Sequence, residues 1–253
     1  MKLQRNKMKK LSRIISIIAV IGLASCSSSK DATKNMSAEE LYNHAYDLLE
    51  KTAYKKAAQT FEQVETEHPY SRLAIKSKLM AAYSYYRDGK YDDAIIALER
   101  FIKYHPGNKD IAYAYYMKGL CSYEQMPIAD KAQDNTADAL TAFQQLVIRF
   151  PDSEYAKDAE AKLKNIVENL AAHEMEIGRF YLQKGNHLSA LNRFNIVVQS
   201  FPQTTQIEEA LYRQVEIYEI LGMEEEAKIP AHLLEDRYPD SKWTSGAIKL
   251  TKK

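Results

Sequence analysis

Glycine and proline are scarce in this sequence. The chain has 253 residues, of which 8 are Gly and 7 are Pro. Glycine costs backbone entropy in a helix, and proline cannot donate the next helical hydrogen bond, so both residues interrupt helices. Their scarcity therefore favours an all-α protein.

Residue sets that are typical of enzymes are absent as well. There is no P-loop and no dinucleotide-binding glycine fingerprint. His173 and Glu174 begin like the zinc motif H-E-x-x-H, but Ile177 occupies the place of the second histidine. We therefore expect no catalytic residues, no cofactor and no metal ion, and a protein that is not an enzyme.

A positively charged body is also missing. The net charge is +1, but residues 1–25 carry six of the 35 Lys and Arg and no acidic residue. The remainder has 29 basic and 34 acidic residues, a net charge of −5. Because nucleic acids are bound through basic surfaces, we expect no nucleic-acid partner.

The apolar run near the N-terminus is too short to cross a membrane. Ile14–Leu23 has ten residues, whereas a membrane-spanning helix needs about 20. After a basic segment, an apolar run of this length is typical of an export signal. We therefore predict that residues 1–25 are a signal peptide and not part of the folded protein.

The sequence has only two cysteines, Cys26 and Cys121. The small residues Ala24 and Ser25 precede Cys26, and this pattern resembles the bacterial lipobox, which implies cleavage before Cys26 and lipidation of that residue. Acyl chains then anchor the protein to a membrane, through a polar tether over residues 26–36. Cys121 is left without a partner, and we expect it to be a buried thiol. The alternative is an ordinary signal peptide with an incidental cysteine.

Five of the prolines end similar stretches of sequence. They are Pro69, Pro106, Pro151, Pro202 and Pro239. Twelve residues before each stands an alanine (Ala57, Ala94, Ala139, Ala190, Ala227), and eight before stand Phe61, Leu98, Phe143, Phe194 and Ala231. Three stretches have a glycine 17 residues before the proline (Gly89, Gly185, Gly222). The order resembles the tetratricopeptide repeat, a helical hairpin of about 34 residues.

The spacing of the prolines is uneven, at 37, 45, 51 and 37 residues. The third stretch fits the pattern if about eight residues, within a polar loop over 125–136, are inserted after Gly119. In the fourth stretch, residues 152–184 contain no proline, and Asp152 and Ser153 are candidate capping residues. This predicts one long helix between repeats three and four.

These observations predict a right-handed α-solenoid of five tetratricopeptide-like hairpins. Residues 37–151 hold repeats one to three, beginning with a capping box at Ser37 and Glu40. Residues 152–253 hold the long connecting helix, repeats four and five, and a capping helix over 241–253 that covers the last repeat.

Aromatic residues recur at the positions that line the groove in the tetratricopeptide pattern. Counted back from each proline, they give the candidate peptide-binding residues Tyr42, Tyr46, Tyr83, Tyr86, Arg87, Tyr116 and Tyr123. Tyrosine offers apolar area and a hydroxyl with little rotamer entropy to lose. The hypothesis is a groove for an extended peptide that carries aromatic residues. The alternative is that these tyrosines pack between adjacent repeats.

With its lipobox, five repeats and long fourth-repeat helix, the chain resembles the BamD family. These are lipoproteins of the outer-membrane β-barrel assembly machine. The more specific resemblances are Tyr115–Leu120 and the run Ala190-Leu191-Asn192-Arg193. The resemblance implies an outer-membrane location facing the periplasm. It also implies docking on the periplasmic POTRA domains of BamA through Arg193, with Asn192 beside it, and recognition of unfolded barrel proteins.

Two other kinds of protein share these features. One is another lipid-anchored tetratricopeptide scaffold, for pilus assembly or cell-wall coordination. The other is a membrane-associated peptide chaperone that acts without the barrel machine.

Overall fold

In a computed structural model, the described residues are 33, 35–126 and 134–252, and all their regular elements are α-helices. The helices are α2 (Ala38–Glu50), α3 (Tyr54–Glu67), α4 (Arg72–Arg87), α5 (Tyr91–Tyr104), α6 (Ile111–Glu124), α7 (Asp134–Arg149), α8 (Ala156–Gln183), α9 (His187–Ser200), α10 (Ile207–Ile220), α11 (Glu224–Arg237) and α12 (Lys242–Thr251). The predicted all-α class of helical hairpins is confirmed. Within the described ranges, no helix is both long and apolar enough to cross a bilayer.

The chain divides into two compact units, residues 1–77 and 78–253, with the boundary inside α4. The predicted division between residues 37–151 and 152–253 follows the repeats, and it stays a prediction.

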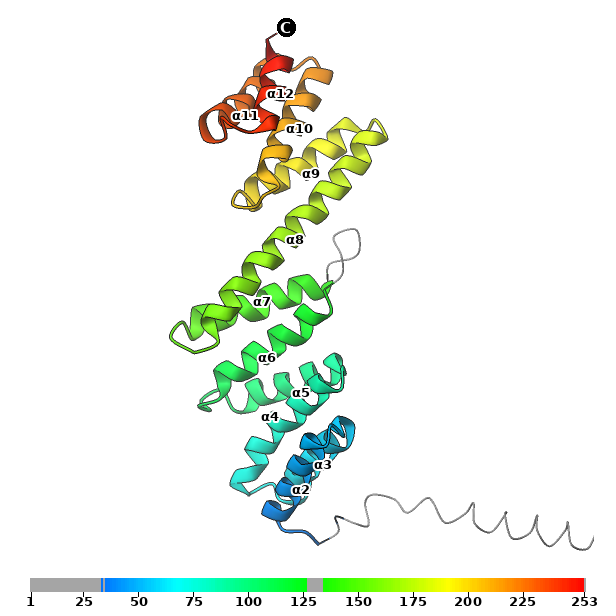
Figure 1. The fold of residues 1–253 in the computed structure, drawn as a ribbon, viewed down its shortest axis with the longest axis vertical. Helices are drawn as coiled ribbons and strands as arrows, with labels where there is room; N and C mark the ends of the chain where they lie inside the picture. The colour runs from blue at the N-terminus through cyan, green and yellow to red at the C-terminus, as the bar shows by residue number, and fades with distance from the viewer. Residues whose placement is uncertain (1–32, 34, 127–133, 253) are drawn as a thin grey trace, which may run out of the picture. The chain divides into compact units, whose positions relative to one another are not determined.

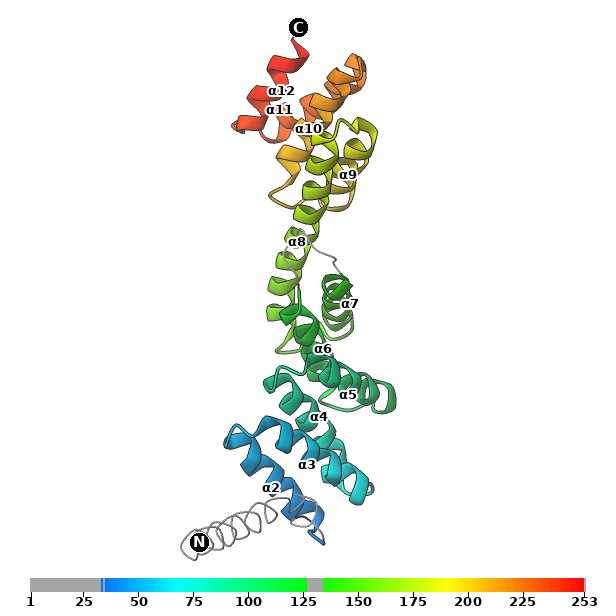
Figure 2. The same cartoon turned by 90° about the vertical axis from the view of Figure 1, so that its right-hand side faces the viewer.

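The first unit contains the hairpin of α2 and α3, which lie side by side (Figure 2). The Ser37 hydroxyl accepts from the Glu40 backbone N–H, and the Glu40 carboxylate accepts from the Ser37 N–H at 2.8 Å. The predicted capping box is therefore present, and it satisfies donors that a helix start leaves open. Between the helices, Phe61 and Leu41 are fully buried.

The prolines end the second helix of each hairpin as predicted. Helices α3, α5, α9 and α11 each stop one residue before a C-cap residue that precedes Pro69, Pro106, Pro202 or Pro239. All four C-cap residues have nearly the same backbone angles, for example φ −130° and ψ 55° at His68. Proline disfavours the helical conformation of the residue before it, which explains the shared geometry.

The turn between the two helices of a hairpin requires a left-handed residue. Gly89, Gly185 and Gly222 have φ of 70°, 72° and 72°. Thr52 occupies the same position, 17 residues before Pro69, with φ of 57°. Glycine adopts this conformation readily, whereas a β-branched residue does so only under strain.

Among the described residues of the second unit, buried side chains form three successive clusters. The first joins the C-terminal part of α4 to α5, α6, α7 and the start of α8, the second joins the end of α8 to α9 and α10, and the third joins α10 to α11 and α12. Neighbouring hairpins in this unit therefore pack on one another along the chain (Figure 1).

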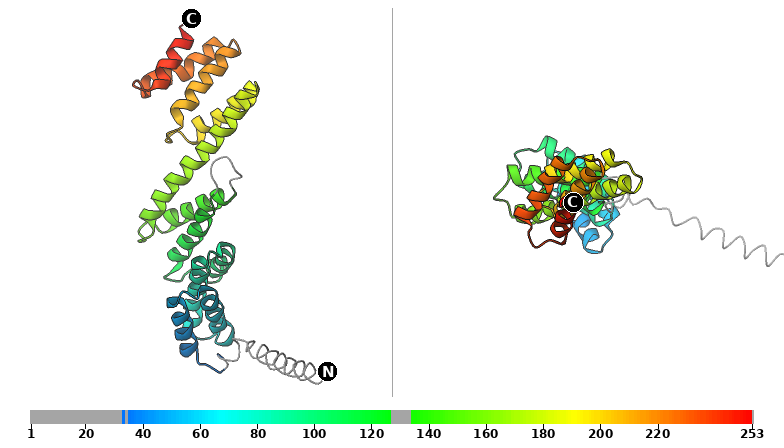
Figure 3. Two further views of the ribbon diagram at one scale, coloured as in Figure 1. Left: turned by 45° about the vertical axis from the view of Figure 1, so that its right-hand side comes forward. Right: turned by 90° about the horizontal axis from the view of Figure 1, so that it is seen from above.

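Helix α8 belongs to two of these clusters. Ala159 and Ile166 in its first half are buried with α6 and α7, whereas Ala171 and Met175 in its second half are buried with α9 and α10. With 28 residues, the helix is about 42 Å long. Figure 3 shows it running from one group of helices to the next within this unit. The predicted long helix between repeats three and four is confirmed.

The start of α8 differs from the prediction. The capping residues predicted at Asp152 and Ser153 are wrong, because the helix begins at Ala156. Two tight turns precede it, in which the Ser153 N–H donates to the Phe150 carbonyl and the Ala156 N–H donates to the Ser153 carbonyl, both at 3.0 Å. The chain uses these residues to change direction after Pro151.

The predicted capping helix over 241–253 is present as α12. Ser241 caps it by accepting from the Trp243 N–H at 3.2 Å. The Trp243 ring lies 5.1 Å from that of Tyr212 on α10. The predicted polar loop of repeat three is shorter than 125–136, because α7 begins at Asp134, and its central part lies outside the described residues.

Candidate binding surfaces

The two candidate tyrosines of the first unit differ in exposure. Tyr42 is 8% exposed, its ring packs edge-on against Phe61 at 5.3 Å, and the Lys76 ammonium lies 5.2 Å from its centroid. Tyr46, one turn later on α2, is 44% exposed. Of the two candidates, Tyr46 is therefore the accessible one, whereas the ring of Tyr42 belongs to the core between α2 and α3.

In the second unit, Tyr83, Tyr86 and Arg87 lie at the C-terminal end of α4. Arg87 Nη1 donates to the Tyr83 hydroxyl at 2.8 Å, and the guanidinium carbon lies 5.7 Å from the Tyr83 ring centroid. The Tyr86 ring contacts that of Tyr91 at 5.7 Å. Arg87 is exposed and the two predicted tyrosines are half-buried, so one flank of each ring faces solvent.

Tyr116 and Tyr123 on α6 lie against the first half of α8. The Tyr116 hydroxyl donates to Asp158 Oδ2 at 2.6 Å, and the Asn165 amide donates to the Tyr123 hydroxyl at 3.3 Å. The Lys162 ammonium lies 5.2 Å from the centroid of the Tyr123 ring. The two tyrosines of α6 and their polar partners on α8 together form an aromatic surface across the α6–α8 junction.

Two further tyrosines belong to this surface, and sequence reasoning missed them. The Tyr155 ring stacks on Tyr116 at 5.1 Å and contacts Tyr113 at 5.5 Å. Tyr155 lies in the turn before α8, outside the helical positions from which groove residues were counted. No signal in the repeat pattern identified it.

The environment of these tyrosines favours the protonated hydroxyl. Burial raises the pKa of Tyr113 well above its ordinary value. Burial also raises the pKa of Tyr116, and the hydrogen bond to Asp158 adds to the effect. Burial raises the pKa of Tyr86 in the same direction. The hydroxyls of Tyr86, Tyr113 and Tyr116 therefore stay protonated, and that of Tyr116 uses its proton in the hydrogen bond to Asp158.

The predicted pair Asn192 and Arg193 lies on α9. Asn192 is exposed, and Arg193 Nη1 donates to Glu174 Oε2 on α8 at 3.0 Å. The buried residues Leu191 and Phe194 on either side of the pair hold α9 against α8. In the sequence, Glu174 belongs only to an incomplete zinc motif, whereas in the structure it lies opposite Arg193.

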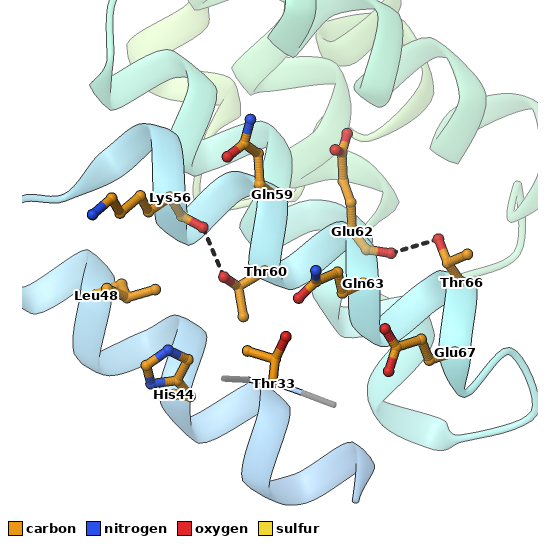
Figure 4. A pocket seen from close by; sticks show the side chains of 10 residues that line it. All are labelled: Thr33, His44, Leu48, Lys56, Gln59, Thr60, Glu62, Gln63, Thr66 and Glu67. Carbon is orange, nitrogen blue, oxygen red and sulfur yellow. Dashed lines mark hydrogen bonds between the residues drawn. The ribbon is translucent and has the colours of Figure 1, made fainter. Parts of the chain in front are cut away.

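A cleft of about 720 Å³ lies between α2 and α3 in the first unit (Figure 4). His44 and Leu48 line it from α2, and Gln63 lines it from α3. The hydroxyls of Thr60 and Thr66 donate to carbonyls of their own helix, at 2.8 and 2.9 Å. Since its lining has both charge signs and no set of unpaired polar groups that converge, the cleft indicates no particular ligand.

Cys26, the predicted lipidation site, lies outside the described residues. Cys121 is a free thiol with no exposed surface, so the predicted buried thiol is confirmed. In residues 33, 35–126 and 134–252, no group of three His, Cys, Asp or Glu side chains could hold a metal ion.

Comparison with known proteins identifies a family. Residues 34–234 match the model of the YfiO family, described as outer membrane lipoprotein. The outer membrane protein assembly factor BamD of Rickettsia prowazekii is 40% identical over 246 residues, which are 96% of this chain and 98% of that protein. BamD of Caulobacter vibrioides is 38% identical over 84% of this chain and 70% of its own length.

A third relative, BamD of Neisseria meningitidis serogroup A, is 32% identical over 256 residues, covering 95% of each chain. The similarity therefore includes all five hairpins and is not confined to a general repeat pattern. The chain belongs to the YfiO family of outer-membrane lipoproteins, in which these relatives are named BamD.

Proposed function

We propose that this chain is a non-enzymatic, lipid-anchored scaffold of the outer-membrane β-barrel assembly machine. Its membership of the YfiO family, over residues 34–234, is the observation that carries the proposal. The anchor is Cys26, and the folded body faces the periplasm. An all-α chain of stacked hairpins suits this role, because such proteins hold other polypeptides on extended surfaces.

The proposed partner on α9 is a periplasmic POTRA domain of BamA. Asn192 is exposed, and Arg193 is 36% exposed, on a helix that is packed into the second buried cluster. A residue on a rigid helix is well placed for recognition, because little order is gained on binding. Arg193 supplies the charge, and Asn192 supplies an amide that can donate and accept.

The proposed substrates are unfolded outer-membrane barrel proteins. Tyr46 in the first unit and Tyr83, Tyr86, Arg87, Tyr116 and Tyr123 in the second unit contact the substrate, and Tyr42 packs on Phe61 below the surface. Barrel strands alternate apolar and polar residues. Partly exposed tyrosine rings complement such segments through ring contacts, and their hydroxyls can form hydrogen bonds.

Depletion of the chain in its own host tests the role in barrel assembly. The expected result is loss of folded porins from the outer membrane, restored by the wild-type chain. The Arg193→Glu variant, at normal protein level, should fail to restore porins and should no longer co-purify with BamA. Normal porin levels after depletion would rule out the barrel-assembly role.

Peptide binding tests the aromatic surface separately. The probe is a synthetic extended peptide with aromatic residues at alternate positions. The Tyr83→Ala/Tyr86→Ala double variant should bind it about tenfold more weakly, because each ring contributes contact area. Tyr70→Ala/Tyr104→Ala is the matched control, since both of its rings are exposed and lie outside the proposed surface. Equal affinity of the two folded double variants would exclude this surface.

A lipid-anchored scaffold for pilus assembly or cell-wall coordination is the alternative function. It shares the anchor and the hairpins, so purification of the native complex distinguishes the two. The proposed function requires BamA in the complex. Pilus or cell-wall proteins in its place would support the alternative.

A further inference from the structure

Three arginines of repeats four and five differ in how many carboxylates they hold. Arg179 on α8 holds two, Glu176 at 2.8 Å and Glu209 at 3.0 Å. Arg213 on α10 also holds two, Glu209 at 3.3 Å and Glu216 at 2.8 Å. Their side chains are 28% and 24% exposed. The guanidinium of each of these two arginines therefore pairs with two carboxylates.

Arg193 holds a single carboxylate among the described residues. Its Nη1 donates to Glu174 Oε2 at 3.0 Å, and its side chain is 36% exposed, more than that of either other arginine. A guanidinium has five N–H donors in a planar fork. The donors that Glu174 leaves unused are enough for a second carboxylate, bound through two parallel hydrogen bonds.

Glu174 is well placed to orient the guanidinium. It is 18% exposed, and it precedes Met175, which is fully buried between α8 and α9. The backbone at Glu174 is therefore fixed by core packing. A free arginine side chain loses rotamer entropy when it is immobilised. An arginine that an internal carboxylate already holds pays less of this cost on binding.

We propose that Glu174 is a positioning residue, which holds Arg193 in a half-filled arginine site that takes a second carboxylate from a protein partner. This inference rests on the proposed docking of α9 on BamA, and it adds the residue that prepares the site. Glu174 and Arg193 together form a neutral pair, so the site takes a carboxylate through the remaining N–H donors of the guanidinium rather than through excess positive charge. A single carboxylate reproduces the arrangement seen at Arg179.

The test measures the dissociation constant between the mature chain and the soluble periplasmic region of BamA. Glu174→Ala should weaken binding about fivefold, because Arg193 is no longer oriented. Glu174→Gln should stay within about twofold of wild type, because its amide oxygen still accepts from Nη1. Glu176→Ala is the matched control on the same helix, since it removes a carboxylate from Arg179 only, and it should leave the constant unchanged.

The double variant Glu174→Ala/Arg193→Gln separates positioning from general structure. A residue that acts through Arg193 has no further effect once Arg193 is gone, so the double variant should bind like Arg193→Gln alone. An added loss in the double variant would overturn the inference. Wild-type affinity of Glu174→Ala would overturn it too. Tighter binding by both Glu174→Ala and Glu174→Gln would also overturn it, because Glu174 would then compete with the partner's carboxylate for Arg193.

The affinity of Arg193→Gln distinguishes failure of the docking proposal from failure of the positioning role. If Arg193→Gln binds as tightly as wild type, α9 is not the docking surface, and the proposed function loses this contact. If Arg193→Gln is about tenfold weaker or more while Glu174→Ala is unchanged, docking stands and only the positioning role fails. If Glu174→Ala lowers the melting temperature, Glu174→Asp replaces it, because the shorter side chain also withdraws the carboxylate from Arg193.

Discussion

The ring of Phe143 on α7 fills the space where Gly119 on α6 would carry a side chain. A Cβ on Gly119 would lie 2.5 Å from Phe143 Cε1. Gly178 on α8 has the same relationship with Phe194 on α9, at 2.6 Å. Gly178 lies 24 residues before Pro202 and Gly119 lies 32 before Pro151, so the two positions agree once the eight inserted residues of repeat three are removed.

The close contact predicts that Gly178→Ala destabilises the protein. The new methyl group forces the Phe194 ring to move within a packed core, and overpacking of this kind costs about 1–3 kcal/mol. Urea denaturation followed by circular dichroism measures the loss. Gly107→Ala is the matched control, because a Cβ there meets nothing within 4 Å, and equal midpoints for the two variants would contradict the prediction.

Thr52→Gly is expected to stabilise the first hairpin. Thr52 has φ of 57° in a position where Gly89, Gly185 and Gly222 stand in other repeats. Left-handed backbone costs a β-branched residue about 1–2 kcal/mol, and the greater freedom of glycine in the unfolded chain offsets part of the gain. The net increase in the free energy of unfolding should be about 0.5–1 kcal/mol.

Gly89→Thr is the reverse substitution and serves as the control for Thr52→Gly. Nothing lies within 4 Å of a Cβ at Gly89, so any loss of stability comes from the backbone conformation. Thermal melting should move up for Thr52→Gly and down for Gly89→Thr. Movement of both variants in one direction would show that the φ angle does not decide the effect.

Much of the fold followed from the sequence because each repeat position has one physical role. A proline ends a helix, a glycine permits a left-handed turn, and a small residue lets two helices approach. The start of α8 could not be predicted, because Ser153 is a good cap by type, and only the turn geometry around Phe150 shows that the helix begins later.

Side-chain partners were harder to predict than helices. Counting along the repeat placed Tyr116 among the groove-lining positions, but it could not reveal Asp158 or Tyr155 beside it. Glu174 lies 19 residues from Arg193, and the two meet only because α8 and α9 are antiparallel. Contacts across a hairpin depend on its register and on side-chain direction, which the order of residues does not specify.

Alkaline pH should destabilise the second unit through its buried tyrosines. Burial raises the pKa of Tyr113 in the folded protein, whereas in the unfolded chain a tyrosine titrates near about 10. Above that pH the unfolded state loses a proton that the native state keeps, so stability falls as pH rises. Below about pH 9 the effect is absent, because Tyr113 is protonated in both states.

Tyr113→Phe should reduce this pH dependence, because phenylalanine has no hydroxyl to ionise. The measurement is the urea midpoint between pH 8 and pH 11 for the wild type and the variant. Tyr104→Phe is the matched control, with an exposed ring on α5, and its pH dependence should equal that of the wild type. Parallel curves for Tyr113→Phe and the wild type would contradict the assignment.

Cys121 should be unreactive until the protein unfolds. Burial raises the pKa of its thiol to about 12, and the thiolate is the species that reacts with disulfide reagents. At pH 8 a thiol of that pKa is ionised in about one molecule in ten thousand, and its side chain has no exposed surface. A chromogenic disulfide should therefore label Cys121 in urea and not in buffer.

The same experiment reports the state of Cys26. In the chain purified from outer membranes, an acylated Cys26 leaves no reactive thiol in buffer and one in urea. The unprocessed chain made without export should show two in urea, because its Cys26 keeps a free thiol. Tyr104→Cys adds an exposed thiol on α5 and proves that the reagent is active. Labelling of Cys121 in buffer at the rate of Tyr104→Cys would contradict its burial. Two reactive thiols in urea for the membrane-purified chain would contradict lipidation.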